Sequence, residues 1–191
     1  MLFLNDTKFV ARRKFFALAG QVYVNDGAGG LVCYVRQKMF KLKEDITVYS
    51  DESQTMPILN IKARQIIDFA AAYDIVDSAT GAKMGALKRK GLKSIIKDEW
   101  IIMDSTDNNI AVLKEESGLM AILSRLINLI PQRYVILMGG SGQVVGTIRQ
   151  RFNIFIHKFD IDFSMDPGAS LDRRLGMGAA ILLLIIEGQQ G

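Results

Sequence analysis

The stretch LDRRLGMGAAILLLIIEGQQG (171–191) decides the fold of this chain. Twelve consecutive residues in it, Leu175 to Ile186, carry neither a charge nor a polar side chain. As a helix they rise about 18 Å, whereas a bilayer core is roughly 30 Å thick, so the run is short for a membrane anchor. Its length, with Gly176 and Gly178 inside it, favours a helix over a buried strand. Because such a helix is apolar on every face, the rest of the protein has to enclose it.

We predict that this helix spans about residues 168–187. Either Asp166, which precedes a proline, or Ser170 is of the residue type that begins helices. Gly188 suits a C-terminal cap.

Four segments repeat one pattern: a short apolar strand, a polar turn, and a strand that ends in charge. They are QVYVNDGAGGLVCYVRQK (21–38), AYDIVDSATGAKMGALKRK (72–90), EWIIMDSTDNNIAVLKEE (99–116) and RYVILMGGSGQVVGTIRQR (133–151). An aromatic residue lies near the start of each segment, and the turns contain Gly or Asn, which tolerate positive φ. This order of elements indicates antiparallel hairpins.

Further extended segments bring the total to about eleven or twelve strands: FVARRKFFAL, DITVYS, PILNIKAR, IIDFAA and FNIFIHKFDIDFS. A second helix is predicted at SGLMAILSRLINLIP (117–131), where apolar residues recur at helical spacing. A barrel with more than eight strands can hold a helix at its centre. We therefore predict a mainly β fold with two helices: a closed antiparallel barrel of about twelve strands around the buried C-terminal helix, as one domain over residues 1–191.

The composition is that of a folded protein with a basic balance. Of its 191 residues, 49% are hydrophobic and 23% are charged, and the net charge is +4. Cys33 is the one cysteine, which excludes an internal disulfide and favours a reducing, cytoplasmic compartment. The N-terminal segment does not match a secretory signal, because its basic cluster follows the apolar residues. The positive charge suits anionic partners such as lipid headgroups or nucleic acid, and equally an ordinary charged surface.

Two stretches, with the final apolar helix, resemble the LURP-one-related family: YVRQKMFKLKEDITVYSDE (34–52) and AYDIVDSATGAKMGALKRKGLKSIIKDEW (72–100). The resemblance covers about residues 8–187. That family is similar to the phospholipid scramblases and shares the tubby-like fold, so the resemblance implies a twelve-stranded barrel around a central C-terminal helix. Tubby proteins bind phosphoinositides, scramblases move lipids in response to calcium, and plant LURP-one-related proteins are linked to defence without an agreed activity.

The chain departs from the scramblase pattern in two ways. It lacks the cysteine cluster that scramblases use for acylation, and it has no proline-rich arm, since its only prolines are Pro57, Pro131 and Pro167.

A third departure concerns calcium. Scramblases carry an acidic calcium segment just before the helix, and here that region reads DIDFSMDPGASLD (160–172). If it is aligned as a calcium loop, Met165 replaces the required glycine and Leu171 the bidentate glutamate. A strand followed by a helix cap is favoured, and calcium binding by Asp160, Asp162 and Asp166 stays open.

The sequence shows no catalytic constellation. His157 is the only histidine and lies in a strand pattern, which favours a structural or surface role over that of a base. Cys33 has the features of a small buried hydrophobic residue, and a Cys33–His157 pair is the catalytic alternative left open. GGSGQVVG (139–146) lacks the Lys-Ser/Thr ending of a phosphate loop and predicts a hairpin turn. We expect a non-enzymatic protein with no cofactor and no bound metal.

The strongest functional feature is the segment KRKGLKSIIK (88–97). Arginine offers phosphate a fork of donors and lysine a point charge. In a strand, Lys88 and Lys90 lie on one face and Arg89 on the other. The neighbouring acids Asp98 and Glu99 neutralise part of the positive charge. The alternative is a solvated barrel rim. We name the residues predicted to bind anionic lipid the basic hairpin: Lys88, Arg89, Lys90 and Lys93.

Four further cations occupy equivalent positions in other hairpins: Arg36, Lys38, Arg149 and Arg151. They extend one basic surface if the hairpins are neighbours in space.

We therefore expect a non-enzymatic binding module for anionic phospholipid or phosphoinositide headgroups, cytoplasmic and peripheral at the membrane. A protein-interaction or nucleic-acid-associated regulatory scaffold is the alternative, with a protein partner favoured over nucleic acid. Scramblase-like lipid transfer is the third reading. No transmembrane span is predicted.

Overall fold

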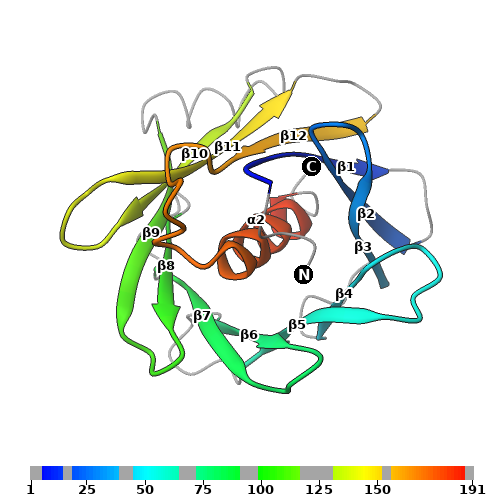
Figure 1. The fold of residues 1–191 in the computed structure, drawn as a ribbon, viewed down its shortest axis with the longest axis horizontal. Coiled ribbons are helices and arrows are strands. Elements are labelled where there is room, and N and C mark those ends of the chain that lie inside the picture. The colour runs from blue at the N-terminus through cyan, green and yellow to red at the C-terminus, as the bar shows by residue number, and fades with distance from the viewer. Residues whose placement is uncertain are drawn as a thin grey trace.

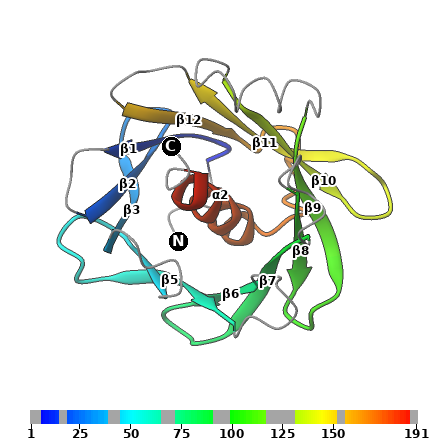
Figure 2. The same cartoon turned by 180° about the vertical axis from the view of Figure 1, so that it is seen from behind.

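The structure, a computed structural model, describes residues 6–14, 19–38, 45–64, 72–90, 99–116, 131–151 and 156–187. Twelve strands and the helix α2 lie within these residues. The strands form a closed antiparallel barrel, and the helix runs through its centre (Figures 1 and 2). The predicted second helix (117–131) falls, except for its last residue, outside the described ranges.

The strands follow one another around the barrel in chain order. Each pairs with its neighbour along the chain, and β12 closes the barrel against β1, where Phe9 lies opposite Ile161. This confirms the predicted architecture. The strands are β1 (Lys8–Lys14), β2 (Ala19–Asp26), β3 (Leu31–Lys38), β4 (Ile46–Tyr49), β5 (Pro57–Ala63), β6 (Ala72–Asp77), β7 (Lys83–Arg89), β8 (Glu99–Asp104), β9 (Asn109–Glu115), β10 (Arg133–Met138), β11 (Val144–Arg151) and β12 (Ile156–Asp162).

All four predicted hairpins are confirmed, as β2–β3, β6–β7, β8–β9 and β10–β11. Side chains alternate along them between the barrel interior and the outside. In β6, for example, Tyr73, Ile75 and Asp77 are buried, while the residues between them are partly exposed. The predicted positive φ occurs in the turns, at Gly29 (92°), Gly81 (71°) and Gly140 (78°).

Helix α2 (Arg173–Glu187) fills the barrel, and its whole run from Leu175 to Ile186 is buried. Its small residues let it lie close to the barrel wall. A Cβ atom at Gly178 would lie 2.6 Å from Ile75 Cδ1, and one at Gly176 would lie 2.9 Å from Phe163 Cε1. The glycines therefore belong to the packing between helix and wall, and the predicted buried helix is confirmed.

The predicted start of this helix is wrong. The helix begins at Arg173, because Asp172 provides the N-terminal cap: its Oδ1 accepts a hydrogen bond from the backbone N–H of Arg174 at 2.9 Å. Asp166 instead closes the preceding turn by accepting the N–H groups of Ser170 and Leu171. Residues 168–170 thus belong to that turn.

Candidate functional site

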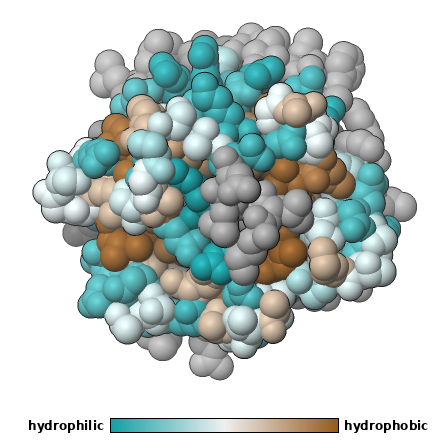
Figure 3. Space-filling model, viewed as in Figure 1, coloured by the Kyte–Doolittle hydropathy of each residue, from teal (hydrophilic) through white to brown (hydrophobic). Residues whose placement is uncertain are grey.

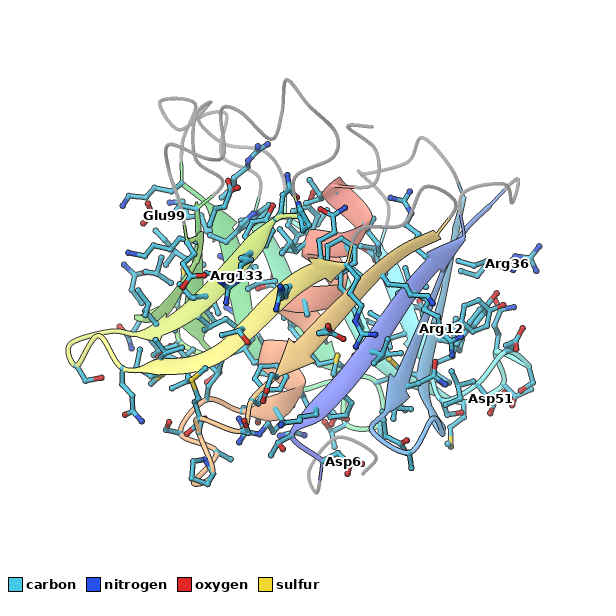
Figure 4. The ribbon with its side chains drawn as sticks, turned by 90° about the horizontal axis from the view of Figure 1, so that it is seen from above. Asp6, Arg12, Arg36, Asp51, Glu99 and Arg133 are labelled. Carbon is cyan, nitrogen blue, oxygen red and sulfur yellow. The ribbon has the colours of Figure 1, made fainter. Side chains whose placement is uncertain are left out.

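The two ends of the barrel differ in charge. Odd-numbered strands all run in one direction, and near their final residues each carries Lys or Arg, at what we call the basic end: Arg12, Arg36, Lys62, Lys88, Lys114 and Arg149. Even-numbered strands run the opposite way, and most have an aspartate at their final residue or within two residues after it, at what we call the acidic end: Asp26, Asp51, Asp77, Asp104 and Asp162. Figure 4 shows Arg36 toward one end, and Asp6 and Asp51 toward the other.

Two residues of the basic hairpin, Lys88 and Arg89, belong to β7 at the basic end, and Lys90 follows them. Lys88 is exposed and has only Ala72 and Ile101 directly opposite it on the neighbouring strands. Lys90 forms an ion pair with Glu99, Nζ to Oε1 2.8 Å, as the sequence predicted for this acid. Arg89 is less exposed, which agrees with its predicted place on the other face. Lys93 lies outside the described residues.

The condition under which Arg36, Lys38, Arg149 and Arg151 would extend one basic surface with the basic hairpin, that their hairpins are neighbours in space, is not met. Strands β3, β7 and β11 are separated from one another by three intervening strands in the closed barrel. Arg36 on β3 and Lys88 on β7 therefore face different directions, although both lie toward the same end. Lys38 also belongs to β3, but its side chain lies outside the description.

A continuous basic patch lies elsewhere, on the outer face of β10, β11, β12 and β1. We call it the basic wall, and its members are Arg12, Arg133, Arg149, Arg151 and Lys158. In the register of the sheet, Lys158 lies directly opposite both Arg12 and Arg151, and Arg149 lies directly opposite Arg133. Figure 4 faces this wall, with Arg133 toward one side of it and Arg12 toward the other.

Sequence reasoning found only Arg149 and Arg151 of the basic wall. It did not identify the other members, because Arg12 and Lys158 become neighbours only where β12 pairs with β1. The detectable signal was the even spacing of charges in β12, where Lys158 and the acids after it share the outer face.

One acid lies within the basic wall and another at its edge: Asp160 is directly opposite Arg149 in the sheet, and Glu116 follows β9. Asp160 binds Arg151 through both oxygens, at 2.5 Å to Nη2 and 2.6 Å to Nε. This hydrogen bonding raises the pKa of the Arg151 guanidinium. Glu116 lies 3.3 Å from Nε of Arg133.

The acidic end is built from aspartates that close the turns. Asp104, at the end of β8, accepts hydrogen bonds from the backbone N–H groups of Asn108 and Thr106 and from the Thr106 hydroxyl. Led by the Asn108 hydrogen bond, these contacts lower the pKa of Asp104 to about 2. Figure 3 views this end and shows hydrophilic side chains interrupted by separate hydrophobic patches. The other aspartates of the acidic end likewise accept hydrogen bonds from backbone N–H groups of the turns that follow them.

Ion pairs anchor the helix at the acidic end. Arg173, which is buried, binds Asp166 at 3.1 Å and lies over the Phe163 ring. Arg174 binds Asp77 of β6 at 3.1 Å and its own cap Asp172 at 2.8 Å.

A buried arginine meets the other end of the helix. Arg13 of β1 points inward, and its guanidinium donates to the carbonyl oxygen of Leu184 at 3.4 Å. That carbonyl belongs to the last helical turn, where cations are favoured. Burial lowers the pKa of the Arg13 guanidinium.

Each of the three aspartates considered for calcium lies beside a different basic side chain. Asp160 binds Arg151, Asp162 lies 3.8 Å from Lys8, and Asp166 binds Arg173. In the described ranges, no three His, Cys, Asp or Glu side chains come together as metal ligands.

The remaining sequence candidates have structural positions. Cys33 is fully buried, and burial raises the pKa of its thiol. His157 belongs to β12, but its side chain lies outside the description. The segment 139–146 contains the β10–β11 hairpin turn, as predicted. Of the helical residues that are described, none form a helix long and apolar enough to span a bilayer.

Comparison with known proteins identifies relatives of this barrel. A model of the LURP-one-related family matches residues 31–183. The X-ray structure of a protein from Arabidopsis thaliana has a similar fold, with a TM-score of 0.51 and 11% sequence identity over 95% of this chain and 92% of that chain. At this identity the likeness concerns the fold alone. No curated protein matches the sequence significantly.

Proposed function

This chain belongs to the LURP-one-related family, and we propose that it is a non-enzymatic binding module for anionic phospholipid headgroups, cytoplasmic and peripheral at the membrane. The observation that carries this proposal is the gathering of Lys and Arg at the basic end of the barrel. Each such cation close to an anionic bilayer contributes on the order of 1 kcal/mol.

Binding is assigned to the outside of the barrel. Helix α2 occupies the centre, and its apolar side chains pack against the inward residues of the strands. The cations, in contrast, point outward: Arg12, Arg36, Lys62, Lys88, Lys114 and Arg149 are all exposed. Among the described residues, no ion pair neutralises these six side chains.

Charge segregation also supports an orientation. The basic end is attracted to an anionic membrane, while the aspartates of the acidic end are repelled by it. The protein then approaches with its odd-numbered strands pointing toward the lipid.

Co-sedimentation with vesicles tests the proposal. We expect binding to phosphatidylserine vesicles at low salt, weaker binding at high salt because the charges are screened, and no binding to neutral phosphatidylcholine vesicles. Absence of binding to anionic vesicles, or preferential salt-dependent binding to duplex DNA, would contradict the proposal and favour the scaffold alternative.

A charge-reversal series tests the basic hairpin. The variant Lys88→Glu/Arg89→Glu/Lys90→Glu should bind phosphatidylserine vesicles more weakly. The matched control, Lys88→Arg/Arg89→Lys/Lys90→Arg, keeps the charge and should bind as the wild type does. Equal binding by both variants would exclude the basic hairpin from the interaction.

A further inference from the structure

The basic wall places like charges directly against one another. Arg151, Lys158 and Arg12 occupy one row across β11, β12 and β1, and adjacent strands lie about 4.8 Å apart. Arg149 joins this row to Arg133, because it lies two residues from Arg151 on the same face and directly opposite Arg133. The result is a path of cations over four neighbouring strands, which passes around Asp160, the residue opposite Arg149 on β12.

Like charges directly opposite each other destabilise a sheet. The nearby acids relieve this repulsion only in part: Asp160 holds Arg151, and Glu116 holds Arg133. In the described part of the chain, Arg12, Arg149 and Lys158 form no ion pair. Asp160, which holds Arg151, lies directly opposite Arg149, and Arg12 donates to the side-chain oxygen of Asn25 at 3.1 Å. A bound dianion would offset the remaining repulsion.

The residue types of the wall favour one class of anion. Arginine presents a planar fork of donors that matches phosphate oxygens, and the lysine adds a point charge. A phosphomonoester carries close to two negative charges at pH 7 and three strong acceptor oxygens. A phosphodiester or a carboxylate carries one charge. Closely spaced cations on adjacent strands should therefore bind a phosphomonoester more tightly than a phosphodiester or a carboxylate.

The predicted basic hairpin lacks this density. Lys88 faces Ala72 and Ile101 across the sheet, and Lys90 is held by Glu99. The hairpin offers general attraction to negative charge, whereas the wall places Lys158 directly between two arginines, Arg12 and Arg151, on adjacent strands.

We propose that the basic wall is a phosphomonoester site that gives this protein selectivity among anionic headgroups. The site itself is argued from the cations of the basic wall. Only the assignment of the phosphate to a lipid rests on the proposed function. The same chemistry is present in phosphatidate in a membrane and in glycerol phosphate in solution.

Vesicle binding with matched variants tests the site. Phosphatidate and phosphatidylserine vesicles are compared at equal surface charge with three proteins: the wild type, Arg12→Gln/Arg149→Gln/Lys158→Gln, and Lys88→Gln/Arg89→Gln/Lys90→Gln. We expect the wild type to prefer phosphatidate, with affinity for it falling on the order of tenfold in the wall variant. The hairpin variant should bind both vesicles more weakly and keep the preference. A preference that survives in the wall variant would overturn the inference.

The pH dependence provides a second readout. The second ionisation of a phosphomonoester has a pKa near 6, while Arg and Lys stay charged through this range. Affinity for phosphatidate should therefore rise between pH 5.5 and 7.5, and affinity for phosphatidylserine should stay level. Equal, pH-independent binding to both lipids would overturn the phosphomonoester site while leaving the proposed function standing.

Titration with glycerol phosphate separates the two sources. Binding that requires the wall, without attachment to any vesicle, would support the site and contradict the membrane function. The melting temperature of the wall variant reflects two opposed changes: neutralisation relieves like-charge repulsion, and Arg12→Gln removes the hydrogen-bond donor to the buried Asn25. If the wall variant melts lower, Arg12→Lys/Arg149→Lys keeps the charges and tests the loss of the arginine fork alone. Unchanged selectivity in that variant and in the glutamine variant would contradict the site.

Discussion

The guanidinium of Arg174 lies 3.1 Å from the carboxylate of Asp77 and joins the start of the central helix to the β6–β7 hairpin. Asp77 uses its two oxygens for different tasks: Oδ1 accepts the backbone N–H groups of Ala79 and Thr80, and Oδ2 receives the arginine. One buried side chain thus fixes both a turn and the position of the helix within the barrel.

Asp77→Asn should destabilise the protein by roughly 1–3 kcal/mol, because the ion pair is lost and the side-chain amide places an N–H group against Arg174 where a carboxylate oxygen had accepted its hydrogen bond. Thermal unfolding followed by circular dichroism measures the change. Asp104→Asn is the matched control, since Asp104 closes the equivalent turn at a half-buried position and forms no ion pair within the described residues. An equal loss in both variants would assign the effect to the turn and contradict the anchoring role of the ion pair.

Stability should fall in acid. The pKa of Asp77 is lowered by hydrogen bonds from Thr80 and Ala79 and by Arg174. At Asp166 burial opposes ionisation, but hydrogen bonds from Ser170 and Leu171 and the charge of Arg173 outweigh it and lower the pKa. A lowered pKa means that the unfolded chain binds protons more readily, so the stabilisation is complete above the ordinary value near 4 and is lost below it.

The melting temperature should accordingly change little between pH 7 and 5 from these groups and decline below pH 4. Asp77→Asn should show a shallower decline, because one of the linked protonation sites is gone. A decline as steep as that of the wild type would remove Asp77 from the acid transition.

Gly85→Ala should destabilise the barrel by about 1–3 kcal/mol through overpacking. A Cβ atom at this position of β7 would lie 2.3 Å from the backbone oxygen of Met103 and 3.0 Å from Leu175 Cδ2 of the helix. Backbone cannot move aside as a side-chain end can. Gly27→Ala is the control, since no atom lies within 4 Å of its added Cβ. Comparable denaturant midpoints for the two variants would contradict the close approach.

Leu183→Asp should prevent folding, because it places a charge at a position of the helix that is 1% exposed. Soluble yield and the cooperativity of thermal unfolding measure the outcome. Leu183→Met conserves volume and should cost less than about 1.5 kcal/mol. A cooperative, wild-type melting curve for Leu183→Asp would refute the buried position of this helix.

Much of the fold can be predicted from local sequence. The apolar run from Leu175 to Ile186 requires an enclosure, and four repeated hairpins with glycine or asparagine turns provide it. Both signals depend on residues close together in the chain, for which spacing translates directly into a helix face or a strand face. The predicted start of the helix is wrong because three residues of a capping type, Asp166, Ser170 and Asp172, lie close together in the chain. The local sequence does not show which of them caps the helix and which belongs to the turn before it.

The sequence by itself therefore determined the barrel, its central helix and the basic character of β7. The tertiary structure alone decided which cations are neighbours. Arg12 and Lys158 lie at opposite ends of the chain and become adjacent where the barrel closes, and Arg174 reaches Asp77 only because the helix is threaded through the strands. The physical reason is that strand register and barrel closure are set by the packing of the whole core. The residues next to a charged side chain in the sequence therefore do not show which side chain will lie opposite it in the sheet.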